Sequence, residues 1–139
     1  MSTTTATTIP GLFFDQVKQS AEQPALHFKQ DGTWQIQTWS QVADRVVQMV
    51  SVLRSLGAEP GDRIIQLAEN CSQWIIADLA IQACGAIHVP VHTPLTGSQI
   101  AYQISDSGAR IVLISDQEQA EKLAAASSEL PGRLQVVCY

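Results

Sequence analysis

The sequence predicts an α/β fold, in which a mainly parallel sheet carries helices on both faces and follows a short helix and a small antiparallel hairpin. Two observations support this prediction. From residue 64 onward, short and continuously apolar runs alternate with helical segments, and unbroken apolarity is typical of strands that are covered on both faces. Helix start and stop signals also recur regularly, so the chain resembles a βαβαβαβ series with right-handed crossovers.

The first ten residues differ in composition from the rest of the chain. Residues 1–10 are Thr-rich and uncharged and lack periodicity, so we expect a disordered tail. A short helix is expected from Gly11 to about Ala21, with Leu12, Phe13 and Val17 on one side. No linker, repeat or low-complexity block divides the remainder, so residues 11–139 are expected to form a single α/β subdomain.

A hairpin is predicted by the segment PALHFKQDGTWQIQTW, which begins at Pro24. Two alternating runs flank Asp31-Gly32, a dipeptide that favours a two-residue hairpin turn because both central positions of that turn need a positive φ. We therefore expect a small antiparallel pair of strands here.

Four helices are predicted after the hairpin from their first and last residues. A capping box, in which two side chains bind free N–H groups of the first turn, is predicted for Thr38 with Gln41, Asn70 with Gln73, Thr96 with Gln99, and Ser115 with Glu118. The stop signals are Gly57, Gly85, Gly108 and the pair Pro131-Gly132.

The first two of these helices have different apolar patterns. In the first, a stripe consists of Val42, Val46, Val50 and Leu53, flanked by Ala43 and Val47. The second, Trp74 to Ala83, is apolar nearly all round and must pack on more than one side. Strands are expected at Ile64–Ala68, Ala86–Val91, Arg110–Ile114 and Leu134–Cys138.

Composition excludes several classes of protein. Of the 139 residues, 45% are hydrophobic and 15% charged, which is typical of a globular domain. A net charge of -5 with scattered Lys and Arg disfavours nucleic acid and anionic membrane as partners. No apolar run reaches the roughly 18 residues of a transmembrane segment, and the first residues lack the features of a signal peptide. A cytoplasmic location is therefore expected.

The cysteines and histidines do not predict a metal site. Cys71, Cys84 and Cys138 lack CxxC spacing and are expected to be core thiols. His88 and His92 have the spacing of helical zinc ligands, but Pro90 lies between them in a predicted strand. Four strand residues span about 13 Å, which is too far for two ligands that each lie about 2 Å from one ion. His27, on the hairpin, is no better a candidate.

Ligands of open parallel sheets usually bind beyond the carboxyl ends of the strands. The corresponding loops are Glu69–Ser72, Val91–Gly97 and Ser115–Glu118. No GxGxxG, GxxxxGK[ST] or GxSxG motif occurs in the sequence, which disfavours a dinucleotide site, a P-loop and a hydrolase elbow. We therefore assign no catalytic, cofactor-binding or metal-binding residue.

Two residues in these loops are the nearest to functional candidates, and two others could face the same crevice. His92 and Thr93 lie where a ligand could bind, although a polar residue between two prolines is more often part of a solvated turn. Glu69 and Asn70 could face the same crevice, but a helix-capping role is sufficient for Asn70.

Other conspicuous residues have structural interpretations. Asp62 follows Pro60-Gly61 and is expected to stabilise a turn. Asp78 lies on an apolar helix and needs a partner, such as an arginine. The three tryptophans are dispersed and are expected to anchor the core: Trp34, Trp39 and Trp74.

Four sequence blocks resemble the N-terminal part of the AMP-forming acyl-CoA synthetases. The blocks are PALHFKQDGTWQIQTW, TWSQVADRV, LGAEPGDRI and ENCSQWIIADLAIQACGAIHVPVHTPLTGSQIAYQISDSGARIVLI, which together span residues 24–114. Within this adenylate-forming superfamily, the chain is most similar to long-chain fatty-acid-CoA ligases. One departure is His92, because that group commonly has an aromatic residue after VPV.

The resemblance implies a two-step reaction in an intact enzyme. A carboxylate attacks ATP, with Mg²⁺, to form an acyl-adenylate, and the CoA thiol then takes the acyl group. The family's phosphate loop, magnesium-binding glutamate and mobile lysine lie beyond the matched region, so the resemblance implies no cofactor site here. Alone, the chain is expected to be an inactive fragment that self-associates and whose natural partner is the remainder of the ligase.

Two alternatives differ from this interpretation. A free-standing, non-catalytic α/β binding or interaction module is favoured by the absence of reactive constellations. A nucleotide-binding Rossmann domain would need a glycine fingerprint and ranks last. Because the sequence stops in a predicted strand, the expectation of a fragment could be checked in the coding sequence beyond Tyr139.

Overall fold

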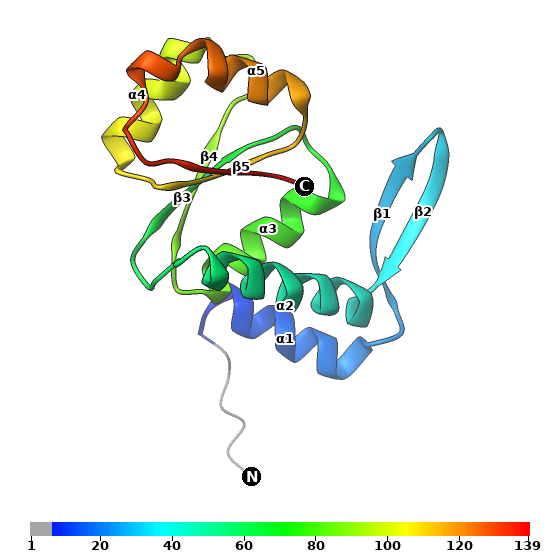
Figure 1. Ribbon diagram of the computed structural model, residues 1–139. Helices are drawn as coiled ribbons and strands as arrows, with labels where there is room; N and C mark the ends of the chain where they lie inside the picture. The colour runs from blue at the N-terminus through cyan, green and yellow to red at the C-terminus, as the bar shows by residue number, and fades with distance from the viewer. Residues whose placement is uncertain (1–6) are drawn as a thin grey trace.

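The computed structural model describes residues 7–139 and shows an α/β arrangement with a projecting hairpin (Figure 1). The first four elements are α1 (Ile9–Ser20), β1 (Pro24–Gln30), β2 (Thr33–Thr38) and α2 (Trp39–Ser55). They are followed by β3 (Arg63–Leu67), α3 (Ser72–Ala83), β4 (Ile87–Val91), α4 (Gly97–Ser107), β5 (Ile111–Ile114), α5 (Gln117–Ala125), a short 3-10 helix (Ser127–Glu129) and β6 (Gln135–Cys138).

The main sheet is parallel and has the strand order β4-β3-β5-β6. Ile64 of β3 lies opposite His88 of β4 on one side and Ile111 of β5 on the other. The chain therefore passes from β3 to β4 in one direction and then crosses back over β3 to β5. This confirms the predicted series of parallel strands and places β3 and β5 in the centre of the sheet.

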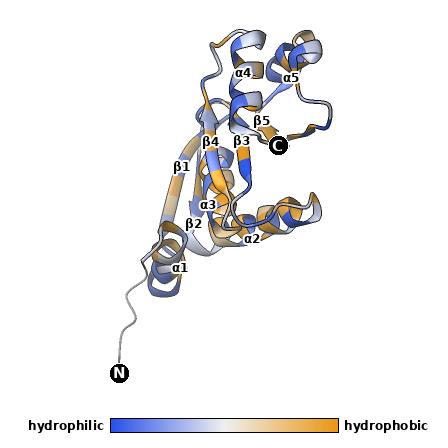
Figure 2. Cartoon of the chain, turned by 90° about the vertical axis from the view of Figure 1, so that its left-hand side faces the viewer, coloured by the Kyte–Doolittle hydropathy of each residue, from blue (hydrophilic) through white to orange (hydrophobic). Residues whose placement is uncertain are grey.

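Each face of the sheet packs against its own group of helices (Figures 1 and 2). On one face, Ile64 and Leu113 pack with the apolar sides of α1, α2 and α3. On the other, Ile65 and Val112 pack with α4 and α5. Successive strand residues point to opposite faces, so the continuous apolar runs supply two hydrophobic cores at once.

The helix starts agree with the sequence at two of the four predicted capping boxes. Thr38 with Gln41 and Thr96 with Gln99 form the reciprocal bonds of the capping box at α2 and α4. Helix α1 begins at Ile9, two residues before the expected Gly11, because the Thr8 side chain caps it. Residues 1–6 of the expected tail lie outside the described residues.

A helix stop that needs glycine is found at the end of α4. Gly108 has a φ of 67°, a left-handed conformation that favours glycine. A Cβ atom at this position would also lie 2.8 Å from the Arg63 guanidinium, which donates to the Ser107 carbonyl at the end of the same helix. Glycine therefore permits both the turn and this capping contact.

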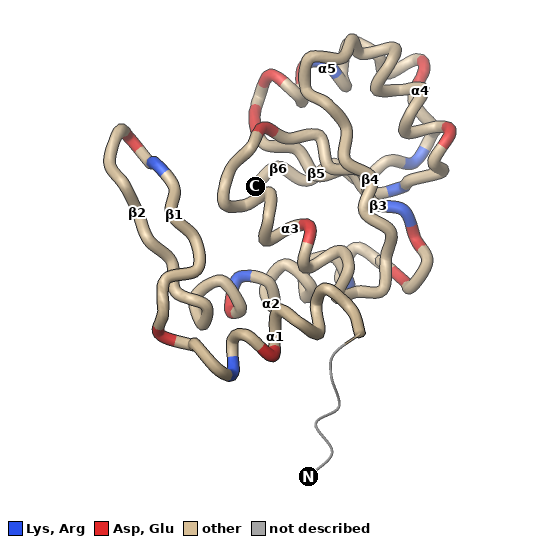
Figure 3. Tube along the Cα trace, turned by 180° about the vertical axis from the view of Figure 1, so that it is seen from behind, with Lys and Arg blue, Asp and Glu red and all other residues tan. Residues whose placement is uncertain are grey.

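The hairpin β1–β2 is antiparallel, as predicted, and its turn at Asp31 and Gly32 has the two positive φ values that the dipeptide indicated. The hairpin projects from the body of the molecule (Figures 1 and 3). For this reason the expectation that Trp34 anchors the core is wrong: its side chain is 64% exposed, near the turn, with the Lys29 ammonium 5.3 Å from its ring. Trp39 packs on Phe13, and Trp74 is half-buried.

Helix α2 confirms most of the predicted stripe. Val42, Val46 and Leu53 are buried, whereas Val47, expected beside the stripe, is 54% exposed. Helix α3 packs against β3 and β4 as well as α1 and α2. Its nearly all-apolar surface therefore has neighbours on more than one side, as predicted.

The three cysteines occupy different environments. Cys84 is buried, as expected for a core thiol, and burial raises its pKa. Cys71 is half-buried and Cys138 is exposed, so the expectation of a core thiol is wrong for Cys138. The difference follows from position, since Cys138 lies on the edge strand β6.

Truncating Leu53, which has no exposed surface, tests the packing of α2. Leu53→Ala should lower the free energy of unfolding by about 2–5 kcal/mol, through lost burial and the cavity that remains. The matched control on the same helix is Val47→Ala, whose side chain is largely exposed and whose effect should stay below about 0.5 kcal/mol. Urea denaturation followed by circular dichroism measures both; equal losses would contradict the assignment of the buried face.

Candidate functional site

The carboxyl edge of the parallel sheet is the candidate site on topological grounds. The connection after β3 leads to α3 on one face, whereas the connection after β5 leads to α5 on the other (Figure 1). Such a reversal of direction between adjacent strands leaves a crevice in which open α/β sheets usually bind ligands. In this protein the crevice lies between the loops that begin at Glu69 and Ser115.

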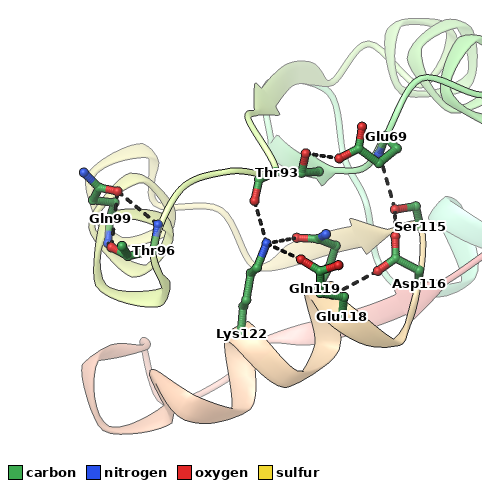
Figure 4. A network of polar contacts seen from close by, with 9 residues as sticks. All are labelled: Glu69, Thr93, Thr96, Gln99, Ser115, Asp116, Glu118, Gln119 and Lys122. Atoms are coloured by element: carbon green, nitrogen blue, oxygen red, sulfur yellow. Dashed lines mark hydrogen bonds and ion pairs between the residues drawn. The ribbon is translucent and has the colours of Figure 1, made fainter.

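A network of hydrogen bonds joins the loops around this crevice (Figure 4). The Thr93 hydroxyl, which follows β4, donates to the Glu69 carboxylate, which follows β3. The Glu69 backbone N–H donates to the Ser115 hydroxyl over 3.3 Å, and that hydroxyl donates to the Asp116 carboxylate. The loops after three neighbouring strands are thus joined to one another, and their polar groups are used internally.

Lys122, on α5, joins the network from the other side of the crevice. Its ammonium donates to the Thr93 carbonyl at 2.7 Å and pairs with the Glu118 carboxylate at 2.9 Å. The side chain is only 25% exposed. Lys122 was not predicted from the sequence. Its position four residues after Glu118 on a helix could have indicated the ion pair. The contact with Thr93 depends on tertiary packing and had no local signal.

The cap of α5 differs by one residue from the prediction. The N-cap is Asp116 rather than Ser115, and its carboxylate accepts from the Gln119 backbone N–H at 3.1 Å. The hydrogen bond from the Ser115 hydroxyl, together with that from Gln119, lowers the pKa of Asp116. Ser115 is displaced from the capping role because its hydroxyl lies between the Glu69 backbone and the Asp116 carboxylate.

The predicted cap of α3 by Asn70 is also wrong. The N-cap residue is Cys71, and no side chain caps the first turn. The helix begins at Ser72, so Asn70 lies one residue too early to reach the free N–H groups. Asn70 instead lies exposed beside the loop that ends β3.

His92 and Thr93 do lie together, as predicted, at a small cavity of about 280 Å³ at this edge of the sheet. Glu69 and Asn70 also line it. Thr93 is buried and its hydroxyl is held by Glu69, whereas His92 is exposed. The structure thus brings the four sequence candidates together but leaves Thr93 and Glu69 bound to each other.

The sheet's N-terminal edge, opposite this site, contains two arginines that line one cavity, Arg63 and Arg110. Arg63 donates to the Ser107 carbonyl at 2.7 Å, and Arg110 lies 3.4 Å from Asp62. Asp62 also accepts from the Glu59 backbone N–H at 3.0 Å, which is the turn-stabilising role expected for it. Both guanidinium groups therefore lie at the edge of the sheet opposite the candidate site.

Asp78 has a different partner from the one expected. Its carboxylate lies 2.7 Å from His88 Nδ1 and accepts from the Gln82 amide at 2.8 Å, so this partly buried acid is paired with a histidine and not an arginine. His88 packs edge-on against Trp74. Burial lowers the pKa of His88, although the Asp78 carboxylate acts in the opposite direction.

A buried polar group that was not foreseen from the sequence lies on the same face of the sheet. Gln66 of β3 has no exposed surface, and its amide donates to the Trp74 carbonyl at 3.3 Å and to the Tyr139 hydroxyl at 2.6 Å. Burial raises the pKa of Tyr139 to about 12. Gln66 thereby links β3 to α3 and to the end of β6.

His88 and His92 do not converge on a shared site, because His88 Nδ1 faces Asp78. Within residues 7–139, no group of three or more His, Cys, Asp or Glu side chains is arranged to hold a metal ion. In the same described region, no helix is long and apolar enough to cross a membrane.

Comparison with known proteins identifies the family. The chain matches the family model of AMP-binding enzymes over residues 13–139, and it therefore belongs to that family. It is 29% identical to the long-chain-fatty-acid–CoA ligase FadD15 of Mycobacterium bovis over 107 residues, which are 77% of this chain and 18% of the relative. It is also 33% identical to tyrocidine synthase 3 of Brevibacillus parabrevis over 124 residues, or 89% of this chain and 2% of the relative.

Solved structures show the same fold. A fatty acyl CoA synthetase of Mycobacterium tuberculosis superposes with a TM-score of 0.84 at 23% sequence identity, over 94% of this chain and 26% of that protein. This chain thus has the architecture of adenylate-forming domains and spans about a fifth or less of the length of the curated relatives named above.

Removal of the Lys122 ammonium should destabilise the carboxyl edge. Lys122→Met keeps the aliphatic stem but leaves the Thr93 carbonyl without its donor, so the free energy of unfolding should fall by about 1–2 kcal/mol. Lys18→Met is the matched control, because the Lys18–Asp15 pair is exposed and should contribute less than about 1 kcal/mol. Urea denaturation measures the difference; indistinguishable variants would show that the Lys122 contacts contribute nothing.

Acidification should destabilise the protein through His88. An unfolded histidine binds a proton near pH 6.5, whereas folding holds the pKa of His88 below that value. The unfolded state therefore binds more protons below about pH 6.5, and stability should fall from that pH until the folded pKa is passed. His88→Gln should reduce this loss between pH 7 and 5.5, while the exposed control His92→Gln should keep it. A wild-type slope in the His88→Gln variant would contradict the assignment.

Proposed function

We propose that this chain is the N-terminal structural portion of an AMP-forming acyl-CoA ligase of the long-chain fatty-acid class. The intact enzyme would activate a carboxylate with ATP to an acyl-adenylate and then transfer the acyl group to CoA. The family match over residues 13–139 carries this proposal, and the similarity to FadD15 supports the substrate class. Fatty acid, ATP and CoA are accordingly the ligands proposed for the whole enzyme.

The residues at the carboxyl edge do not fit ATP, CoA or Mg²⁺, and we assign these cofactors to the remainder of the ligase. ATP and CoA are polyanions that need Arg and Lys donors, but three carboxylates at this edge, Glu69, Asp116 and Glu118, accompany the single ammonium of Lys122. Glu69 and Asp116 already accept hydrogen bonds from Thr93 and Ser115. The fragment is therefore proposed to be inactive and to bind no cofactor.

The proposed partner of this chain is the rest of the ligase, and an isolated copy is proposed to self-associate. Support comes from large apolar side chains that remain exposed: Ile9, Leu12, Trp34, Ile36, Val47, Val52, Ile75, Ile87, Tyr102 and Val136. These side chains are distributed over α1, β2, α2, α3, β4, α4 and β6, and we propose that part of this exposed apolar surface is covered by the rest of the ligase or by a second copy. We propose a cytoplasmic enzyme; a peripheral association of the intact ligase with membranes is compatible with this location.

A free-standing binding module is the second candidate function. It is favoured by an open groove of about 730 Å³ between the hairpin and the start of α3, lined by residues that include Phe28, Trp34 and Gln73. In that case the chain would bind a ligand or partner without catalysis.

Calorimetry of the isolated chain tests its proposed role. Titration with ATP and Mg²⁺ should give no saturable heat in the micromolar range, because the carboxyl edge is acidic and internally bonded. Addition of palmitate with ATP should release no pyrophosphate in a coupled assay. A catalytically complete acyl-CoA ligase, assayed in parallel, is the positive control. Micromolar ATP affinity or pyrophosphate release by this chain would overturn the proposal that it is an inactive structural portion.

A further inference from the structure

His88 of β4 lies beneath one row of side chains from α3. Trp74, Asp78 and Gln82 are spaced four residues apart and therefore lie on the same face of that helix. The His88 ring is 5.1 Å from the Trp74 ring, measured between centroids, and its Nδ1 lies 2.7 Å from the Asp78 carboxylate. Because 9% of the His88 side chain is exposed, the ring is almost fully enclosed between an indole and a carboxylate.

The second ring nitrogen, His88 Nε2, is a buried atom without a hydrogen-bond partner among residues 7–139. Nδ1 faces a carboxylate and so carries the proton of the neutral ring, which leaves Nε2 as an acceptor. Protonation of the ring would turn Nε2 into a donor that also has no partner. An unpaired buried donor is unfavourable, so the packed arrangement favours the neutral ring.

In the described part of the chain, the charge that faces this ring is that of the Asp78 carboxylate. From β3, Gln66 lies on the same face of the sheet and is neutral, as is the Tyr139 hydroxyl that it contacts, whose pKa is about 12. Arg63 at the start of β3 directs its guanidinium to the end of α4, and α4 packs on the opposite face of the sheet. Burial lowers the pKa of His88 more than the carboxylate raises it, so enclosure outweighs the ion pair.

Trp74 connects this ring to the candidate site. The residue lines the cavity of about 280 Å³ at the carboxyl edge, together with Asn70 and His92. It is the third residue of α3, a helix whose first turn no side chain caps, and uncapped helix ends are among the first parts of a fold to open. A change in the packing of the indole on His88 therefore changes a wall of that cavity.

We propose that His88 is a pH-sensitive switch that sets the position of Trp74 at the carboxyl-edge cavity. With a neutral ring, the indole packs against His88 and the cavity has the shape described above. When the ring takes up a proton from solvent at Nε2, this nitrogen needs an acceptor, and the indole moves away so that water reaches it. Asp78 remains paired with Nδ1 in both arrangements. The switch is a property of the described residues and does not rest on the proposed ligase role.

Proton linkage gives the direction and the size of the effect. In the open arrangement water reaches the ring and Asp78 still faces it, so the pKa of His88 is at least the ordinary value of about 6.5. In the packed arrangement the pKa of His88 lies below that value. The open arrangement therefore binds the proton more tightly, and its ratio to the packed one rises up to ~10-fold for each unit by which the pH falls between the two pKa values.

Tryptophan fluorescence tests the switch. The variant Trp34→Phe/Trp39→Phe leaves Trp74 as the one tryptophan of the chain. Acrylamide should quench its emission more strongly as the pH falls from about 8 to about 5.5, while circular dichroism verifies that the chain stays folded. Adding His88→Gln should abolish the change, because an amide does not titrate in this range. His92→Gln, the matched control at the same cavity, should keep it.

A charge substitution separates the switch from a purely structural role of the pair. Asp78→Asn keeps a side chain of similar size but removes the charge that favours the protonated ring, so the pH midpoint of Trp74 quenching should move to lower pH. A midpoint that stays the same in the folded variant would show that Asp78 and His88 are not the pair that titrates.

Fluorine NMR makes the test independent of the tryptophan substitutions. In wild-type protein labelled with 5-fluorotryptophan, the Trp74 signal, assigned by its loss in Trp74→Phe, should move with pH. The Trp39 signal, from a ring packed on Phe13, should not. A Trp74 signal and quenching that stay constant overturn the switch even if acid lowers the overall stability, as does a change that persists in His88→Gln. Neither result bears on the ATP titration that tests the proposed ligase role.

Discussion

The structure depends on the burial of the central strands β3 and β5 on both faces. Ile64 and Leu113 face α1–α3, while Ile65 and Val112 face α4 and α5. A strand that is apolar on both sides can exist in water only if helices cover both sides. Because crossovers between parallel strands are right-handed, the face over which each helix returns fixes the side on which the next strand is added.

The same constraint explains why polar groups gather at the carboxyl edge. Parallel strands end at one side of the sheet, so the first polar residues after β3, β4 and β5 meet there: Glu69, Thr93 and Ser115. In this protein these groups bind one another and Lys122 (Figure 4). The site therefore joins three loops firmly, and the chemistry of an AMP-forming ligase is assigned to other parts of the proposed enzyme.

Much of the fold could be predicted because the signals are local. The capping box of Thr38 with Gln41 spans one helical turn, and the positive φ values at Asp31-Gly32 depend on two adjacent residues. The predicted caps Asn70 and Ser115 were wrong by one residue, because a competing contact or a later helix start decides which residue reaches the free N–H groups. Cap identity at such positions depends on neighbours that are distant in the chain.

By itself, the sequence determined the order and type of the elements and the two-sided burial of the strands, because these depend on periodicity and on turn chemistry within a few residues. Only the tertiary structure decided that Asp78 pairs with His88, that Lys122 reaches the Thr93 carbonyl and that Trp34 lies exposed. These outcomes depend on which distant segments meet, and several partners of equal chemistry compete for each charge or apolar surface. Packing of whole helices against the sheet, rather than local preference, selects among them.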